Sequence, residues 1–359
     1  MSRFTAQARV AVPFMDLRPM HDGLRARLLA EISDLIDAGS FTNGPQVAEF
    51  ERAFAAYCGT ADCVGLASGL DALRLVLLAA GVEPGDEVIV PANTFIATLE
   101  AVTQAGATPV PVDVNINVAA AEAAVTAHTR CFLPVHLYGQ LADVGALRVL
   151  ADRTGLTLFE DACQAHGAKR DGVRAGTAGL AAAFSFYPPK NLGAMGDAGA
   201  LVTDEPELAA HVCALREHGQ RAKYRHDWQG YTARLDTIQA LVLLRKLPHL
   251  NRWNEQRRAA ARFYGEALAG VGDVVVPPVP AGSDPVWRLY VVRTANPEKL
   301  AAFLAERGVG SGRHYPDARD ALTADLPGDH RRAACRGGRH GRRVFRRCRL
   351  ARQTRRSAG

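Results

Sequence analysis

The 359-residue sequence has no long apolar run, no secretory leader and no paired cysteine motif. No uninterrupted apolar stretch approaches the ~20 residues that a membrane-spanning helix needs. Residues 1–14 lack the continuous apolar core of a signal peptide. The seven cysteines form no Cys-x-x-Cys pair, and their odd number argues against a disulfide framework or a zinc site. We therefore expect a cytoplasmic protein with reduced thiols, no membrane association and no bound metal.

Two motifs that identify common enzyme classes are also missing. No Gly-x-Ser-x-Gly sequence occurs, since Ser68 lacks the first glycine, and this disfavours a hydrolase. The glycine-rich residues 308–312 lack the Gly-x-Gly-x-x-Gly spacing of a dinucleotide site. The chemistry of the protein must therefore lie in other residues.

The positive charge of the chain is confined to its last residues. Residues 317–359 contain 13 of the 43 basic residues and 4 of the 37 acidic ones, a net charge of +9. The other 316 residues carry a net charge of −3. A nucleic-acid-binding regulator would therefore depend on this tail alone and would show salt-sensitive DNA affinity. We expect no nucleic-acid partner.

A lysine at the end of a predicted buried strand is the most informative feature of the sequence. The apolar run Ala181 to Phe186 predicts a strand, and Pro188 and Pro189 end it just before Lys190. A solvated charge is unusual at such a position. A lysine there can form a Schiff base, because burial lowers its pKa and frees the amine. Lys190 is our candidate for that role.

Strands and helices alternate through the first two thirds of the chain. Alternation with short connections implies right-handed βαβ units and a mostly parallel sheet covered by helices, which is an α/β fold. Short apolar runs predict strands at 87–91, 108–112, 131–137, 156–159, 181–186 and 200–202. Helical spacing predicts helices at 22–37, 46–57, 94–105, 119–127, 143–153 and 205–217.

Ligands of such sheets bind at the carboxyl ends of the strands. The residues directly past those ends are 93–95, 136, 160–161 and 187–190, and they form the candidate site. A buried carboxylate at Asp161 is costly unless it is paired or hydrogen-bonded. Asp161 either caps the turn at 162–165 or pairs with the protonated ring nitrogen of pyridoxal phosphate. Phe95 either stacks on such a ring or belongs to the core.

A Ser-Gly turn precedes the helix that starts near residue 69. The N–H groups at a helix start and the positive end of its dipole suit a phosphate. Ser68 and Asp71 also have the spacing of a capping box, and the two interpretations are compatible.

The second half of the chain predicts a smaller domain. Helices are expected at 235–246 and 251–268, and the second would join two domains. Residues 218–234 are expected as a loop, 286–293 as a strand and 298–307 as a helix. We expect a large domain at 1–247, a small α+β domain at 248–316 and an anomalous arginine-rich tail at 317–359.

Together these stretches resemble the DegT/StrS family of sugar aminotransferases, which has the aspartate-aminotransferase (type I pyridoxal phosphate) fold. The similarity extends from Val12 to Pro316. Its most specific parts are Pro134 to Gln140, Glu160 to Gly167 and Phe184 to Gly193. The resemblance implies a homodimer with shared active sites, in which residues 223–234 reach the partner's site.

The resemblance also implies a role for each site residue. Lys190 would carry pyridoxal phosphate as a Schiff base, and Asp161 would keep the ring nitrogen protonated. The other cofactor-binding residues would be Gly69, Leu70, Phe95, Gln164, Ser185 and Thr232. The sugar-nucleotide side would be lined by Tyr187, Lys223, His314 and Tyr315.

The sequence departs from the family at three places. The family usually has a small or hydroxyl residue where Leu70 stands, and often Asn where Thr232 stands. Past Pro316 the family continues with an ordered small domain, whereas 20 of the 29 residues at 331–359 are Arg, Ala or Gly. Such a composition cannot bury a core. We interpret the tail as an out-of-frame translation, which resequencing of the gene would test.

The expected reaction is transamination of a nucleotide-linked keto-6-deoxyhexose to an amino sugar, with glutamate as donor and the 3-keto sugar favoured. A 4-keto sugar is the alternative substrate. A family member that is non-catalytic because its C-terminus is truncated is the alternative function. A relative that dehydrates sugars would have His in place of Lys190.

Overall fold

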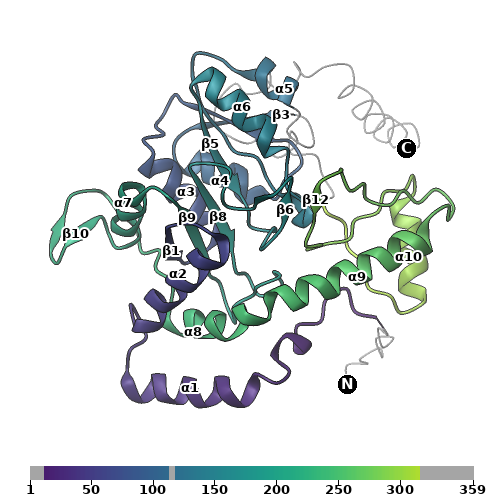
Figure 1. The fold of residues 1–359 in the computed structure, drawn as a ribbon, viewed down its shortest axis with the longest axis horizontal. Helices are drawn as coiled ribbons and strands as arrows, with labels where there is room; N and C mark the ends of the chain where they lie inside the picture. The colour runs from purple at the N-terminus through teal and green to yellow at the C-terminus, as the bar shows by residue number, and fades with distance from the viewer. Residues whose placement is uncertain (1–11, 113–117, 316–359) are drawn as a thin grey trace, which may run out of the picture.

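The computed structural model describes residues 12–112 and 118–315 (Figure 1). Its centre is one seven-stranded sheet in the order β1-β9-β8-β5-β4-β2-β3. Strands β3, β2, β4, β5 and β8 pair in parallel, and β9 runs antiparallel to β8 and β1. The strands are β1 (Asp62–Leu66), β2 (Glu87–Pro91), β3 (Thr108–Val112), β4 (Thr129–Phe132), β5 (Thr157–Asp161), β8 (Ala181–Ser185) and β9 (Gly199–Thr203). The predicted α/β fold with a mostly parallel sheet is confirmed.

Both faces of the sheet are buried, which explains why the middles of its strands are apolar and the polar residues lie mostly at the strand ends. Successive side chains of β8 point to opposite faces. Ala182 and Phe184 join the core beneath α2, while Ala181 and Ala183 join the core beneath α3. Helices α3, α4 and α7 cover one face, and α2, α5, α6 and α8 cover the other.

The helices form close to the predicted positions. The described helices of the α type are α1 (Arg25–Ala38), α2 (Pro45–Cys58), α3 (Gly69–Ala79), α4 (Ile96–Gln104), α5 (Val118–Ala124), α6 (Val144–Thr154), α7 (Pro206–Arg216), α8 (Thr237–Lys246), α9 (Leu250–Leu268) and α10 (Pro297–Glu306). Short 3-10 turns are η1 (Arg18–His21), η2 (Leu137–Gly139) and η3 (Leu247–His249). No helix in these residues is long and apolar enough to cross a membrane.

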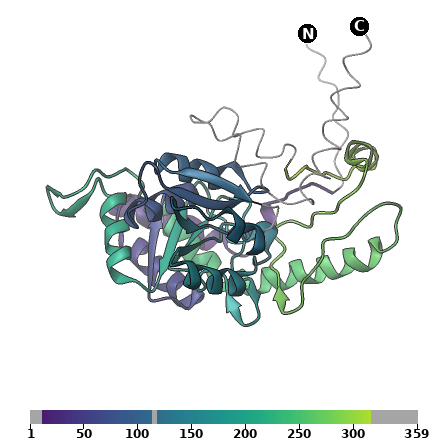
Figure 2. The ribbon, with the colours of Figure 1, turned by 90° about the horizontal axis from the view of Figure 1, so that it is seen from above.

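Helix α9 leads away from the sheet toward α10 (Figures 1 and 2). A small sheet is formed by β6 (Lys169–Arg170), β7 (Val173–Arg174) and β12 (Ser283–Asp284), and Arg258 of α9 donates to Asp284 of this sheet at 3.0 Å. The division into domains at 1–247 and 248–316 stays a prediction. The tail at 317–359 lies outside the described residues.

Three expected elements are wrong in detail. The expected strand 131–137 is regular only to Phe132; residues 133–136 keep isolated bonds to the sheet, such as the His136 N–H to the Asp161 carbonyl at 3.0 Å, and η2 follows. The expected loop at 218–234 contains a hairpin of β10 (Gln220–Ala222) and β11 (Arg225–His226), which projects from the body in both views. The expected strand 286–293 does not form. Trp287 has a φ of 46°, which interrupts an extended backbone, and the segment bonds to η2 instead.

Candidate active site

The candidate site lies where β5 and β8 end and α3 begins. Lys190 follows β8 in a tight loop, in which the Lys190 N–H donates to the carbonyl of Tyr187 at 2.8 Å. The Ala194 N–H returns to the carbonyl of Phe186 at 2.7 Å. A Cβ on Gly193 would lie 2.0 Å from the carbonyl oxygen of Pro188, so the loop closes only with glycine at that position. The loop thus fixes the backbone of the lysine.

The amine of Lys190 is half-buried and electrostatically tuned. Burial is the main cause that lowers its pKa below the usual value, and the Arg288 guanidinium lowers it further. Cys163 and Asp161 act in the opposite direction. A lowered pKa increases the share of neutral amine, which is the form that attacks a carbonyl and accepts a proton.

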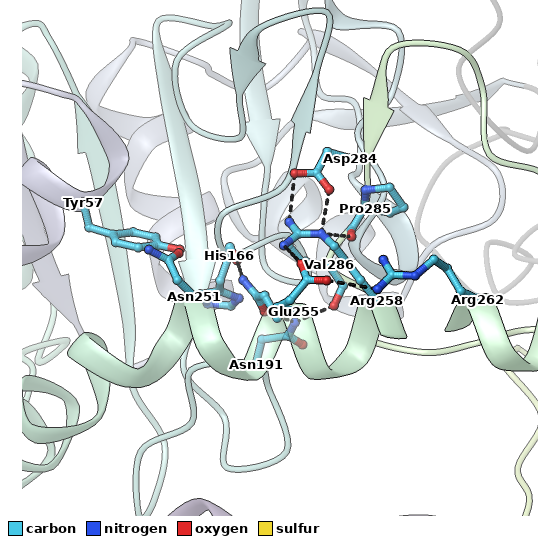
Figure 3. A network of polar contacts seen from close by, with 11 residues as sticks. Tyr57, His166, Asn191, Asn251, Glu255, Arg258, Arg262, Asp284, Pro285 and Val286 are labelled. Carbon is cyan, nitrogen blue, oxygen red and sulfur yellow. Dashed lines mark hydrogen bonds and ion pairs between the residues drawn. The ribbon is translucent and has the colours of Figure 1, made fainter. Parts of the chain in front are cut away.

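Asn191 attaches the lysine loop to α9 (Figure 3). Its amide nitrogen donates to Asn254 Oδ1 and to the carbonyl of Val286, each at 2.8 Å. Asn254 in turn donates to the carbonyl of His166 at 2.8 Å. Both asparagines are buried, so these bonds are not shared with water. The loop of Lys190, α9 and the segment at 286 are therefore held together.

Asp161 ends β5 and is buried, with 5% of its surface exposed. Its Oδ2 accepts a hydrogen bond from Thr98 Oγ1 at 2.7 Å, and its Oδ1 accepts one from the Cys163 N–H at 3.1 Å. No Lys, Arg or His side chain in the described parts of the chain makes an ion pair with it. The carboxylate caps the turn at 162–165, as one of the two interpretations expected. Each of its oxygens accepts only one of these bonds, so the carboxylate can also pair with a cationic group.

The start of α3 packs directly on the end of β8. A Cβ built on Gly69 would lie 2.7 Å from both Cys163 Sγ and Ser185 Cβ, so only glycine allows this approach. Ser68 Oγ accepts from the Asp71 N–H at 3.0 Å, which confirms the predicted cap. The first N–H groups of a helix have no acceptor within the helix. Gly69, Leu70 and Ser185 therefore present donors beside one another.

Several predicted residues contact one another. Gln164 Oε1 accepts from the Tyr138 N–H at 2.9 Å, and its Nε2 donates to Tyr315 at 3.4 Å. Tyr138 OH donates to the carbonyl of His314 at 2.6 Å. Phe95 packs against Tyr315 with ring centroids 6.0 Å apart. These contacts bring residues from four parts of the chain to one place.

Three predicted residues lie apart from this cluster. Tyr187 is 53% exposed beside the lysine loop. Lys223 lies in the turn of the projecting hairpin. The Oγ1 of Thr232, beyond the hairpin, lies 3.3 Å from His218 Nε2. The hairpin points away from the body (Figure 1), so Lys223 on its turn is set apart from Lys190. Thr232 lies outside the hairpin, next to Ala233, whose carbonyl accepts from the Ala67 N–H at 3.0 Å just before α3.

Sequence reasoning missed Thr98, Tyr138 and Arg288. Thr98 lies one turn into the helix after Phe95, and nothing in the sequence links it to Asp161. The signal for Arg288 was a charge inside the apolar run from Val286 to Val292. The position of Arg288 depends on backbone bonds to Tyr138 and Gly139, which are remote in the sequence.

Beneath the site, a buried pair holds β5 in place. The Ala142 N–H donates to His136 Nδ1 at 3.3 Å, so the ring proton is on Nε2, which donates to Glu160 Oε2 at 2.7 Å. Glu160 also accepts from the backbone N–H groups of residues 176, 178 and 179. No group of three or more His, Cys, Asp and Glu in the described residues could hold a metal.

The donor set fits pyridoxal phosphate. The amine suits the aldehyde of that molecule, and the buried carboxylate, which has no cationic partner, suits its ring nitrogen. The N–H and hydroxyl donors at the helix start suit its phosphate. The roles of the individual residues stay predictions.

Comparison with known proteins identifies the family. Residues 23–329 match the model of the DegT/DnrJ/EryC1/StrS aminotransferase family. The chain belongs to this family. The match continues past residue 316, so family similarity enters the first part of the segment that we expected to be anomalous.

Individual relatives agree with this assignment. The chain is 48% identical over 310 residues to dTDP-3-amino-3,4,6-trideoxy-alpha-D-glucose transaminase of Streptomyces venezuelae. The matched region covers 85% of this chain and 82% of the relative. A crystal structure of S. venezuelae DesV in complex with a ketimine intermediate has a TM-score of 0.85 and 47% identity, covering 89% of this chain and 88% of DesV. NtdA of Bacillus subtilis with bound cofactor PMP has a TM-score of 0.81 and 30% identity, covering 91% of this chain and 79% of NtdA.

Proposed function

We propose that this enzyme is a pyridoxal phosphate-dependent aminotransferase that converts a nucleotide-linked 3-keto-6-deoxyhexose to the 3-amino sugar, with glutamate as donor. The observation that carries the proposal is the meeting of Lys190, Asp161 and the start of α3 at the carboxyl edge of the sheet. The names of the relatives support a 3-amino product and a dTDP-linked substrate. A 4-keto sugar of the same class is the second candidate substrate.

The residues divide the work. When bound, the cofactor supplies an aldehyde that takes up amino groups and a ring that withdraws electrons from the carbon being deprotonated. Lys190 Nζ attaches it to the protein. Asp161 holds the proton on the ring nitrogen, and the α3 start with Ser185 binds the phosphate.

Proton movement falls to the lysine. Once the donor's amine has replaced it, Lys190 Nζ takes the proton from the donor's Cα, a task that the lowered pKa favours. The donor's amino group would stay in the site when water releases the donor as a 2-oxo acid, and the same amine would then deliver a proton to the sugar carbon that gains this nitrogen. Phe95, Gln164, His314, Tyr315 and Tyr187 orient the ring and the sugar.

We further propose a cytoplasmic homodimer. The hairpin of β10 and β11 exposes 84% of Tyr224 and projects from its own body, which suits a contact with a second copy. Lys223 and Thr232 then serve the partner's site. A chain with Lys190→Ala and a chain with Lys223→Ala, each inactive alone, should restore partial activity when coexpressed, and no restoration would contradict shared sites.

The central experiment uses colour and product. Wild-type protein with pyridoxal phosphate should show a visible absorbance band that Lys190→Ala abolishes and Lys299→Ala, on the exposed surface of α10, retains. Both 3-keto and 4-keto dTDP sugars are then assayed with glutamate, and the products identified by NMR. A folded wild-type sample without a band rejects the enzyme. Amination at C4 alone replaces the 3-keto assignment.

A further inference from the structure

Arg288, which acts electrostatically on Lys190, and Arg257, which acts on Arg288, carry positive charge without an acidic partner. Arg288 and Arg257 are partly buried, and neither makes an ion pair with a carboxylate of the described residues. The Nε of Arg288 is buried and lacks a hydrogen-bond partner there. Arg257 makes one long bond, from Nη1 to the carbonyl of Trp287 at 3.4 Å. Unpaired buried charge is costly, so such a pair calls for an anion.

The backbone places Arg288 in the site through long-range contacts. The Val286 N–H donates to the carbonyl of Gly139 at 2.8 Å, and the Leu289 N–H donates to that of Tyr138 at 3.4 Å. A Cβ on Gly139 would lie 2.9 Å from the backbone nitrogen of Arg288, so only glycine permits the two backbones to pack this closely. Arg288 is therefore fixed beside the turn whose Tyr138 contacts Gln164.

The surroundings of Arg288 are those of the reacting centre. Its guanidinium acts electrostatically on Lys190, His166 and His314. Burial, with Arg257 as the next cause, lowers the pKa of Arg288 to about 10, while the phenols of Tyr315 and Tyr187 act in the opposite direction. No carboxylate appears among these groups. The guanidinium stays charged at neutral pH, because its lowered pKa of about 10 is still well above 7.

We propose that Arg288 binds the α-carboxylate of the amino donor as a bidentate partner, with Arg257 strengthening the positive potential behind it. This inference rests on the proposed transamination. Guanidinium and carboxylate match in geometry, and burial strengthens the pair. The α-carboxylate is bonded directly to the carbon that Lys190 deprotonates, whereas the diphosphate of a sugar nucleotide is separated from the reacting ketone by the sugar ring. An anion held within electrostatic reach of Lys190 is therefore the donor's carboxylate.

The test separates donor from nucleotide. Arg288→Gln and Arg288→Lys are compared with Arg293→Gln, an exposed arginine of the same segment. Half-reactions of the cofactor-loaded protein with glutamate are followed by absorbance. Calorimetry measures binding of glutarate, an unreactive dicarboxylate, and of dTDP. Far-UV circular dichroism checks folding.

We expect Arg288→Gln to weaken glutamate and glutarate binding roughly tenfold or more, Arg288→Lys to lose less, and dTDP affinity to stay unchanged. Arg293→Gln should behave as wild type. Unchanged glutamate dependence in Arg288→Gln, or a loss confined to dTDP, overturns the assignment. If wild type shows no half-reaction, the proposed function fails, and the glutarate titration alone then decides whether Arg288 is a carboxylate site.

Discussion

Gly69 and Ser185 are in contact across two elements, because a Cβ on Gly69 would lie 2.7 Å from the Cβ of Ser185. The glycine is the first residue of α3, and the serine is the last residue of β8. The contact sets the start of the helix against the end of the strand, where we propose that the phosphate binds.

Gly69→Ala should push the helix start away from β8. Overpacking of this kind costs about 1–3 kcal/mol, and we expect affinity for pyridoxal phosphate to fall about tenfold. A titration followed by absorbance measures it. The control is Gly145→Ala in α6, where a Cβ would meet nothing within 4 Å. Equal affinities of both variants and wild type would show that the contact does not shape the phosphate site.

Thr98→Val should weaken the environment of Asp161. The substitution keeps the shape but removes the hydroxyl that donates to Asp161 Oδ2 at 2.7 Å. We expect the free energy of unfolding to fall by about 1–3 kcal/mol and cofactor affinity to fall several-fold, since a bond to a charged group is lost. Thr103→Val, a half-buried threonine of the same helix whose hydroxyl makes an exposed bond to the Glu100 carbonyl, is the control in urea unfolding. A Thr98 variant as stable as Thr103→Val would contradict the role of this bond.

Asn254→Ala should loosen the loop of Lys190. It removes one of the two acceptors of the Asn191 amide and the donor to the His166 carbonyl, leaving one N–H of Asn191 and the His166 carbonyl unpaired in the interior. We expect a loss of about 2–3 kcal/mol in the free energy of unfolding, with a lower kcat. Asn251→Ala on the same helix loses only an exposed bond from Tyr57, and it should cost less than about 1 kcal/mol (Figure 3). Similar losses in the two variants would exclude a special role for Asn254.

His166 should make the protein sensitive to acid. The ring is buried, and burial lowers its pKa from 6.5 to about 3, with the positive charge of Lys190 as the next cause. Between these values the unfolded chain binds a proton that the folded chain does not, so stability falls as pH falls. The loss should reach about 2 kcal/mol between pH 8 and pH 5.

His166→Leu removes the titrating group and should flatten this part of the pH profile. Neither ring nitrogen has a described partner in hydrogen-bond geometry, although the backbone of Ser185 influences the ring. Urea unfolding at several pH values gives the slope, and His128→Leu, at an exposed turn, is the control. An unchanged slope in His166→Leu would place the acid sensitivity elsewhere.

The sequence was most informative where local pattern decides structure. The strand before Lys190 and the cap at Ser68 depend on neighbouring residues, so apolar runs, prolines and cap spacing were enough to predict them. Asp161 could be placed at a strand end for the same reason. Thr98, however, reaches Asp161 across 63 positions, a distance over which no periodicity extends.

The segment at 286–293 shows why the rest could not be predicted. Its apolar, β-branched composition favours a strand. In the fold, the Val286 N–H donates to the carbonyl of Gly139 at 2.8 Å, and the next residue, Trp287, has a positive φ of 46°. This long-range pairing overrides the local preference, and it also decides where the guanidinium of Arg288 lies.

The two bonds of the Asn191 amide have a mechanical consequence. One nitrogen ties the residue after Lys190 both to α9 and to the carbonyl two residues before Arg288. The backbone segments that carry Lys190 and Arg288 are thereby joined to α9 and to each other before any substrate arrives. A closure of the site around a large sugar nucleotide would involve parts outside these joined segments, such as the hairpin at 220–226 and the segment that carries Tyr315.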